Sequence, residues 1–283
     1  MQNTEPPGVR TADGLTLRGR AWLVAGAPGQ VVIVHGLGEH VGRYAHVASR
    51  LNRAGWSVIG YDQRGHGRSE GPRGRLASEH DLLADLACVI DAVRAESQGR
   101  LVLLGHSLGG LVAARFVAEA LELRPRAWQR DVDALVLSSP ALDVGMRTSQ
   151  KVLLAVLGRL APDFAVANGL DPAWLSHDPA VVAAYTADPL VHDRIAPRLA
   201  RFLVDNGAFV QARAAQWRVP TLLLYAGRDR CVAPRGSRSF AAAAPRDIVE
   251  VREFEPLFHE IFNEPEQVEV FEALEAWLAS RLP

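Results

Sequence analysis

The sequence predicts an α/β fold, with a mostly parallel central sheet and helices on both of its faces. Short runs that are apolar throughout alternate with longer stretches of helical periodicity along the 283 residues. Strands that are buried on both sides have this continuously apolar pattern, because helices cover each face of a parallel sheet. Two ordinary domains would fit this length. However, α/β folds of this size commonly form around one core, and we favour one core with an insertion.

The expected elements follow one another in a regular order. Asp13-Gly14 lies between two short strand-like runs and is typical of a hairpin turn, so the chain should open with two antiparallel strands. Six further strands are expected at residues 31–35, 57–61, 101–105, 134–138, 221–225 and 248–254. Five helices are expected at residues 44–54, 81–95, 108–121, 235–244 and 266–282. This alternation is typical of helices that connect neighbouring parallel strands.

The alternation stops between residues 141 and 217. This stretch has helical patterns and no convincing strand, and aspartate precedes proline at Asp171, Asp178 and Asp188. Because proline cannot continue a helix, we expect short helices separated by turns. We therefore predict a core formed by residues 1–140 and 218–283, with residues 141–217 inserted as a helical cap. An insertion at the carboxyl end of a parallel strand lies over the ligand site of such a sheet.

Composition excludes several classes of protein. The 31 basic and 32 acidic residues give a net charge of −1, which provides no field to recruit nucleic acid. The two cysteines, Cys88 and Cys231, cannot make a disulfide framework, which fits a reducing compartment. The first residues lack the features of an export signal, and no run is long and apolar enough to span a membrane. We expect a cytoplasmic protein, and the sequence does not indicate its oligomeric state.

One strand-to-helix turn carries the strongest chemical signal. The sequence Gly-His-Ser-Leu-Gly at residues 105–109 follows an apolar strand and precedes a helical run. A strand that turns sharply into a helix holds its turn residue in a strained conformation, and glycines on either side prevent collisions. This geometry raises the hydroxyl of Ser107 above the sheet. An ordinary turn is the alternative, but the strand and the helix around the string favour a nucleophile.

A serine hydroxyl needs a base that a carboxylate orients. Asp229 follows the strand expected at residues 221–225, and His259 follows the strand expected at residues 248–254. Both side chains should therefore reach the edge of the sheet at which Ser107 lies. The chain order Ser, Asp, His is one of the known orders of this catalytic triad. Asp229 as a turn residue and His259 as a surface residue are the alternatives, and Glu260 is a rival carboxylate.

Two backbone amides are the expected donors to the oxyanion that acyl transfer creates. The first buried strand ends in a loop with Gly36 and Gly38, which allow amides to turn toward a ligand. We expect the amides of Leu37 and of Leu108, the residue after the nucleophile, to form this pair. A plain glycine-rich turn is the alternative.

Three motifs together carry a resemblance to a known family. They are HGLGEH at residues 35–40, YDQRGHGRS at residues 61–69 and GHSLGG at residues 105–110. With them, the chain resembles the monoacylglycerol lipase and lysophospholipase-like α/β-hydrolases, which are often grouped with the serine aminopeptidases. The resemblance implies that Glu39, Arg43 and His106 line a polar spot for the alcohol part of the substrate. A supporting or surface role is the alternative for each of the three.

The resemblance and the triad together imply a serine carboxylester hydrolase that cleaves single-chain lipid esters, with monoacylglycerols as the leading substrates. They imply no cofactor, and the nine histidines show no metal-binding spacing. A broad carboxylesterase or a lysophospholipase is the nearest alternative. A proline-releasing aminopeptidase is less favoured, because such enzymes usually have His-Gly-Gly-Pro-Gly where this chain has His-Gly-Leu-Gly-Glu. A non-catalytic binding module is the last alternative.

The cap contains one run, residues 152–157, that is apolar on all sides of a helix. It either packs on the core or provides a surface for transient contact with lipid. Together with Leu199, Phe202 and Leu203, we expect this run to line a tunnel for one acyl chain.

Overall fold

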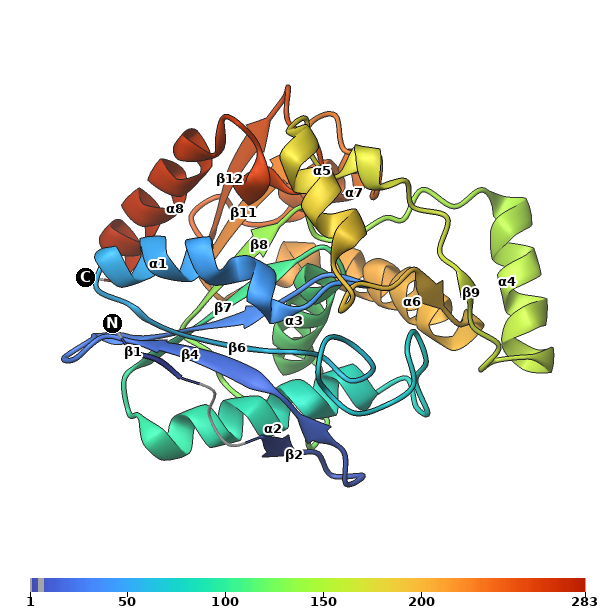
Figure 1. Ribbon diagram of the computed structural model, residues 1–283, viewed down its shortest axis with the longest axis horizontal. Coiled ribbons are helices and arrows are strands. Elements are labelled where there is room, and N and C mark those ends of the chain that lie inside the picture. The colour runs from blue at the N-terminus through green and yellow to red at the C-terminus, as the bar shows by residue number, and fades with distance from the viewer. Residues whose placement is uncertain (1, 5–7, 283) are drawn as a thin grey trace.

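The computed structural model describes residues 2–4 and 8–282, and one main sheet of eight strands runs through them (Figure 1). The strands lie in the order β1-β4-β6-β5-β7-β8-β11-β12. The six strands from β6 to β12 are mutually parallel, and the antiparallel strands β4 and β1 extend one edge. The predicted α/β fold with a mostly parallel sheet is confirmed.

The six parallel strands are the six that the sequence predicts, with small shifts at their ends. They are β5 (Gly29–Val34), β6 (Ser57–Tyr61), β7 (Arg100–His106), β8 (Ala134–Ser138), β11 (Thr221–Ala226) and β12 (Val249–Phe254). Every residue of β8 and β11 is buried. Their continuously apolar sequences therefore reflect a sheet that is covered on both faces.

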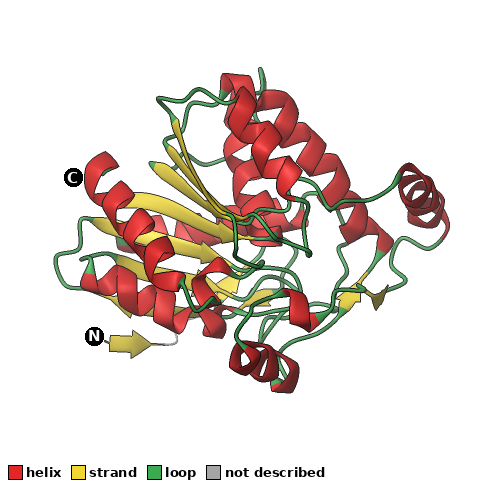
Figure 2. Ribbon diagram, turned by 90° about the horizontal axis from the view of Figure 1, so that it is seen from above, coloured by secondary structure: helices red, strands yellow, loops and turns green. Residues whose placement is uncertain are grey.

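Helices cover both faces of this sheet (Figures 1 and 2). One face packs against α1 (Ala45–Arg53) and α8 (Gln267–Arg281). The other face packs against α2 (Asp81–Glu96), α3 (Leu108–Ala118) and α7 (Pro234–Ala243). Successive strand residues point to opposite faces. Val31 accordingly belongs to the core cluster on the side of α1 and α8, and Val32 to the cluster on the side of α2, α3 and α7.

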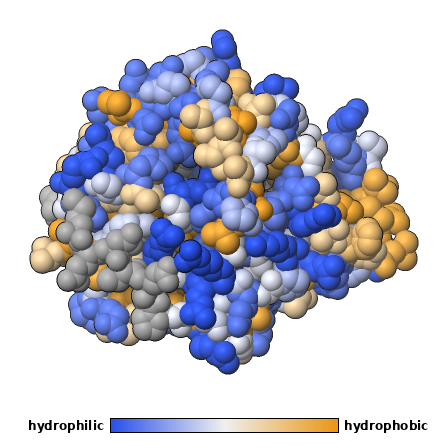
Figure 3. Space-filling view, in the orientation of Figure 1, coloured by the Kyte–Doolittle hydropathy of each residue, from blue (hydrophilic) through white to orange (hydrophobic). Residues whose placement is uncertain are grey.

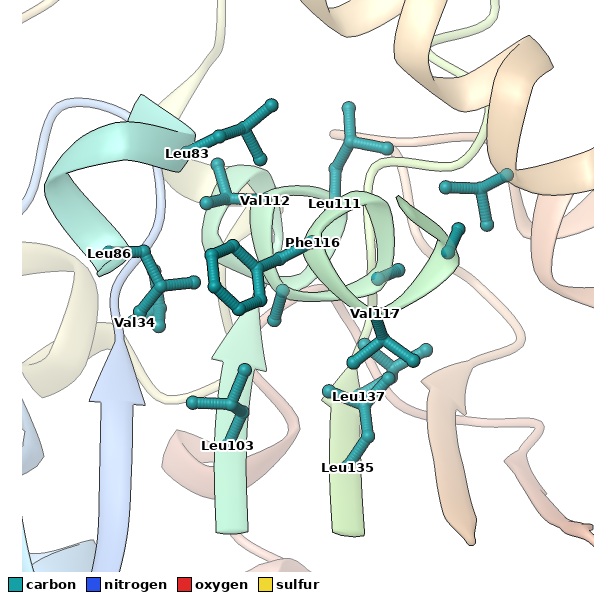
Figure 4. Close-up of a cluster of buried hydrophobic side chains, with 14 of the residues drawn as sticks. Val34, Leu83, Leu86, Leu103, Leu111, Val112, Phe116, Val117, Leu135 and Leu137 are labelled. Atoms are coloured by element: carbon teal, nitrogen blue, oxygen red, sulfur yellow. The ribbon is translucent and has the colours of Figure 1, made fainter. Parts of the chain in front are cut away.

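The larger core cluster surrounds α3. All residues of this helix are buried, because it contacts β7 and β8 below it and α2 and α6 around it. Phe116 lies among apolar side chains of the sheet and of α2, including Val34 and Leu86 (Figure 4). Its side chain is completely inaccessible to solvent. α3 is therefore fixed from all sides, and with it the turn from which it starts.

The opening of the chain differs from its prediction. The hairpin around Asp13-Gly14 forms, but β2 (Val9–Arg10) and β3 (Thr16–Leu17) make a small ribbon of their own. Two strands of the main sheet are absent from the prediction, β4 (Gly19–Leu23) and β1 (Gln2–Thr4). β4 was not predicted because only two of its five residues are buried, so its sequence has no continuous apolar run.

The insertion between β8 and β11 contains the predicted short helices. Its main elements are α4 (Thr148–Leu160), β9 (Val166–Ala167), α5 (Pro179–Ala187), β10 (Arg194–Ile195) and α6 (Pro197–Arg213). Asp171 and Asp178 each cap a helix that starts at the following proline, by accepting a hydrogen bond from a backbone amide. The expectation of no strand here is wrong, because β9 and β10 pair over two residues each.

The two longest helices of the insertion have different surroundings. α6 packs on α3 and α7, and Leu199, Phe202 and Val210 belong to the main core cluster. α4 contacts α6 and stands away from the sheet, at the right-hand edge of both ribbon views (Figures 1 and 2). The division of the chain at residue 217 is still a prediction. We propose that the part free to act as a cap ends earlier, near residue 196, where α6 begins.

Replacing Phe116 by alanine should strongly destabilise the fold. The change removes a fully buried aromatic ring from close-packed surroundings, so the free energy of unfolding should fall by about 3–5 kcal/mol. Urea denaturation followed by circular dichroism measures this loss. Leu123→Ala is the control, because Leu123 is fully exposed and its replacement should change stability by less than about 0.5 kcal/mol. Similar losses in the two variants would contradict this account of the core.

Candidate active site

The predicted nucleophile lies on a strained turn. Ser107 connects the end of β7 to the start of α3, with φ 53° and ψ −118°. Positive φ is unfavourable for a residue with a Cβ atom. Among the described residues other than glycine, only Ser107 and Ser139 adopt it. A side chain on Gly109 would collide with the carbonyl group of Val34, and one on Gly105 with the carbonyl group of Gly109. The glycines therefore allow the close packing that holds this turn.

The predicted base and the carboxylate predicted to orient it meet at the same edge of the sheet. Asp229 follows β11, His259 follows β12, and the Nδ1 atom of His259 lies 2.7 Å from an Oδ atom of Asp229. The other carboxylate oxygen of Asp229 accepts hydrogen bonds from the amides of Cys231 and Val232, at 2.8 and 3.0 Å. Both side chains of the pair are at least 95% inaccessible to solvent. The carboxylate is thus fixed, and it orients the imidazole ring.

The rival carboxylate has a different partner. Glu260 forms two hydrogen bonds with the guanidinium group of Arg43, at 2.6 and 2.7 Å. Asn263 donates a further hydrogen bond to the same carboxylate. Glu260 therefore belongs to an ion pair beside the His259 loop, and Asp229 is the residue that contacts the imidazole.

The surroundings of His259 affect its protonation. Burial by itself would lower the pKa of this histidine, but the carboxylate of Asp229, with smaller effects of Glu260 and Glu39, raises it above its ordinary value. His259 donates its Nδ1 proton to the carboxylate of Asp229, which leaves the Nε2 atom to exchange a proton with another group. His259 and Ser107 line the same cavity.

The loop after β5 contains the first predicted oxyanion donor. The amide of Gly36 donates to the Oε1 atom of Glu39, at 2.6 Å, and Leu37 lines the cavity beside Ser107. Leu108 is the first residue of α3, and amides in the first turn of a helix have no partner within the helix. Leu37 thus lines the same cavity as Ser107, and Leu108 follows Ser107 at the start of α3.

The three residues predicted to bind the alcohol have different positions. Glu39 and His106 line the cavity, whereas Arg43 is not among the lining residues. Arg43 lies behind the cavity wall, where it contacts the carboxylates of Glu39 and Glu260 at 2.8 and 2.6 Å. Burial would raise the pKa of Glu39, but Arg43 outweighs it and lowers this pKa to about 2. Tyr185 of the insertion covers the guanidinium group, 4.8 Å from its ring centre.

His106 is a neutral residue beside the triad. Its Nδ1 atom lies 3.0 Å from the hydroxyl oxygen of Ser138, and its ring centre lies 4.7 Å from that of His259. Burial, followed by the proximity of His259, lowers the pKa of His106 to about 4. His106 therefore carries no charge near neutral pH.

The cavity above Ser107 has a volume of about 340 Å³. The core provides the triad side of its wall, and the insertion provides the opposite side through Asn168, Leu170, Asp171, Pro172, Leu175, Tyr185, Thr186, Asp188, Val191, His192 and Asp193. None of these residues is predicted from the sequence to have a site role. The prediction that Leu199, Phe202, Leu203 and residues 152–157 line an acyl tunnel is wrong. The first three pack in the core cluster, and most of the run lies exposed on α4.

One group of possible metal ligands lies at the triad. Single ligand atoms of Asp229, Cys231 and His259 lie within 4.8 Å of one another. However, Asp229 and His259 are hydrogen-bonded to each other at 2.7 Å, which leaves no space for an ion between them. Burial also raises the pKa of the Cys231 thiol, which opposes the thiolate form that binds metals. These residues do not fit a resident metal.

Comparison with known proteins agrees with this geometry. Residues 26–266 match the family described as "Serine aminopeptidase, S33". The chain is 37% identical to a monoacylglycerol lipase of Mycolicibacterium smegmatis, over 90% of this chain and 89% of that protein. It is 31% identical to the phospholipase YtpA of Bacillus subtilis, over 87% and 93% of the two chains.

A solved structure extends the match to three dimensions. The monoacylglycerol lipase of Paleococcus ferrophilus is 33% identical to this chain, with a TM-score of 0.79 over 99% of this chain and 100% of the other. The family match covers most of the sequence, and these relatives align along nearly their whole length. The chain therefore belongs to the serine aminopeptidase S33 family and has the α/β-hydrolase fold.

Proposed function

We propose that this protein is a serine carboxylester hydrolase that cleaves single-chain lipid esters, with monoacylglycerols as its leading substrates. The observation that carries the proposal is the strained Ser107 in one cavity with the hydrogen-bonded pair of His259 and Asp229. Two relatives of the chain, at 37% and 33% identity, are described as monoacylglycerol lipases. Lipid ester hydrolysis is therefore the reaction that both the site and the relatives support.

The proposed reaction has two half-reactions. His259 accepts the proton of the Ser107 hydroxyl at Nε2 while the oxygen attacks the ester carbonyl carbon, and Asp229 stabilises the imidazolium. The amides of Leu37 and Leu108 donate to the oxyanion. His259 then gives its proton to the departing alcohol, which leaves an acyl group on Ser107. Water attacks this acyl-enzyme with the same base and releases the fatty acid.

The cavity has a polar end for the alcohol and an apolar side for the acyl chain. Glu39 and His106 form the polar end, and we propose that Arg43 supports it by fixing Glu39 rather than by contacting substrate. Leu170, Leu175 and Val191 of the insertion provide apolar surface. Burial of each methylene group against such surface stabilises a complex by about 0.8 kcal/mol.

The charge of the cavity favours a neutral alcohol over a phosphate headgroup. Five carboxylates line it, those of Glu39, Asp171, Asp188, Asp193 and Glu260. No lysine or arginine is among the described residues of its wall. A lysophospholipid would bring a phosphate into this negative field. The same carboxylates would accept the ammonium group of a peptide, so the aminopeptidase alternative needs its own test.

Replacement of Ser107 or Asp229, two members of the proposed triad, should remove most of the activity. Ser107→Ala should lower kcat by about 10³-fold or more, with a normal melting curve, because the hydroxyl supports no packing. Asp229→Asn should lower kcat by about 10⁴-fold, because the imidazole loses the carboxylate that orients it. Glu260→Gln is the control and should cost far less. The assay is hydrolysis of a p-nitrophenyl ester, with labelling by a fluorophosphonate probe as the readout of an activated serine. A labelled and active Ser107→Ala variant would refute the assignment and leave a binding module to be considered.

Activity should fall as the pH falls through the pKa of His259. The base must be neutral, and Asp229 raises its pKa above 6.5, the usual value, so the acid limb of kcat/KM should have its midpoint above that pH. In Asp229→Asn, burial is no longer opposed by this carboxylate, and the limb of the residual activity should move to lower pH. A pH series of kcat/KM for both proteins measures the shift. An unchanged limb would contradict the coupling of the two side chains.

Monoacylglycerols should be cleaved with a far higher kcat/KM than triacylglycerols of the same chain length. A second acyl chain at the polar end would cover the ring of His106, whose Nδ1 atom contacts Ser138, without providing a partner for its other nitrogen, at a cost of about 1–3 kcal/mol for the unpaired group. The measurement is a kinetic series on detergent-dispersed lipids, and prolyl p-nitroanilide, which should not be cleaved, is included in it. Comparable rates on mono- and triacylglycerols would refute the closed polar end, and cleavage of the anilide would favour the aminopeptidase.

We also propose that α4 contacts lipid surfaces transiently. Its exposed residues include Val152, Leu153, Val156, Leu157 and Leu160, each at least 40% exposed, and hydrophobic residues gather at this edge of the molecule (Figure 3). The helix contains Lys151 and Arg159 and no acidic residue, which suits an anionic interface. None of the described helices has the length and apolar content needed to cross a bilayer.

Replacing Leu153 and Leu160 by serine should weaken binding to vesicles of phosphatidylcholine and phosphatidylglycerol, with little change in hydrolysis of a soluble short-chain ester. These two side chains are 57% and 78% exposed, so their loss should not disturb the fold. Vesicle co-sedimentation measures the binding. Val268→Ser is the control, because Val268 is 54% exposed on α8. Equal vesicle binding by wild type and the double variant would contradict the lipid contact.

A further inference from the structure

The insertion is fastened to the loop that carries Leu37. The amide of His192 donates to the carbonyl oxygen of Gly38, at 2.8 Å. Gly38 has φ +78°, and a side chain there would collide with the carbonyl oxygen of His192. The backbones of the core loop and the insertion thus touch at a position that only glycine permits.

A second bond holds the same loop on its other side. The Nε2 atom of His40 lies 2.8 Å from an Oδ atom of Asp188, and the amide of Gly42 donates to the Nδ1 atom of His40, at 3.1 Å. Because Nδ1 accepts, the ring proton is on Nε2, and His40 donates it to Asp188. The second carboxylate oxygen of Asp188 accepts from the amide of Leu190, at 2.8 Å. Asp188 thereby links the core loop to the turn that follows α5.

We propose that Asp188 is a positioning residue, which holds residues 36–40 in the conformation that aims the Leu37 amide at the oxyanion. This inference rests on the proposed function, in which that amide is a donor. The loop has two glycines and is therefore intrinsically mobile. Glu39 fixes it from the inside through the Gly36 amide, and the insertion fixes it from the outside through Gly38 and His40.

Fixing this loop should raise the rate because it preorganises the Leu37 amide. A donor stabilises an oxyanion because it already points at the place where the charge develops. An error of about 1 Å in such a group lowers the rate by up to about 10²-fold. The loss should be the same for every ester, because all of them form the oxyanion. A residue that merely contacts the lipid would instead affect only substrates that reach it.

The first experiment compares Asp188→Ala with wild type on p-nitrophenyl acetate and on a monoacylglycerol. We expect kcat to fall by about 10- to 100-fold on both substrates, with KM changed by less than about threefold. Asp188→Asn keeps an oxygen that can accept from His40, so it should recover much of the loss. Asp178→Ala is the matched control. Asp178 lies at the other end of α5 and accepts from the amide of Ala180 in the same way, but it lies outside the cavity wall. It should retain wild-type kcat.

A second variant approaches the same bond from the core. His40→Asn keeps a side chain that can accept from the Gly42 amide but is too short to reach Asp188. It should reproduce the fall in kcat, and the double variant with Asp188→Ala should be no worse than either single variant, because both remove one interaction. Melting curves of all variants separate these effects from unfolding.

Several outcomes would overturn the inference. They are a kcat of Asp188→Ala within about twofold of wild type, a loss confined to the monoacylglycerol, an Asn variant as impaired as the Ala variant, and additive losses in the double variant. Any of these results with an active wild type and an inactive Ser107→Ala would leave the proposed function intact. A wild type that neither reacts with the fluorophosphonate probe nor hydrolyses esters would overturn both proposals.

Discussion

The close packing of α3 against the strands is the constraint on which the site depends. Gly109 lies so near the carbonyl group of Val34 that no side chain fits between them, and Gly110 is similarly close to Pro140. This contact lets the helix begin directly at the end of β7, and it forces the backbone of Ser107 into its strained conformation. It also brings the first turn of α3 beside the loop that follows β5. Nucleophile and proposed oxyanion donors are thus consequences of one packing arrangement.

A single arginine connects the two loops that flank this turn. Arg43 binds Glu39 in the loop after β5 and Glu260 in the loop after β12, and all three side chains are nearly buried. Buried carboxylates are tolerated only when a cation and hydrogen bonds compensate for lost hydration. One guanidinium group meets this need for both and fixes the distance between the loops. Tyr185 covers it, so the insertion shields this charge cluster from water.

The sequence could predict the features that depend on local pattern. Most of the six parallel strands are continuously apolar, and Ser107, Asp229 and His259 each follow one of the six, so alternation and topology placed them at one edge. β4 was missed because a strand with only two buried residues has no such pattern. The cavity wall could not be predicted either. Asp188 looked like one more Asp-Pro turn, yet its bond to His40 joins residues 148 positions apart, and only tertiary structure decides such a contact. The same holds for Phe202, which lies in the core because α6 packs on α3.

The carboxylates around the cavity also bear on how a turnover ends. In the proposed reaction the second product is a fatty acid, which ionises to an anion as soon as it is released from Ser107. That anion is formed in a cavity lined by five carboxylates, of which Glu39 and Glu260 share the charge of Arg43 and the other three are Asp171, Asp188 and Asp193. Electrostatic repulsion therefore favours its departure and disfavours its return.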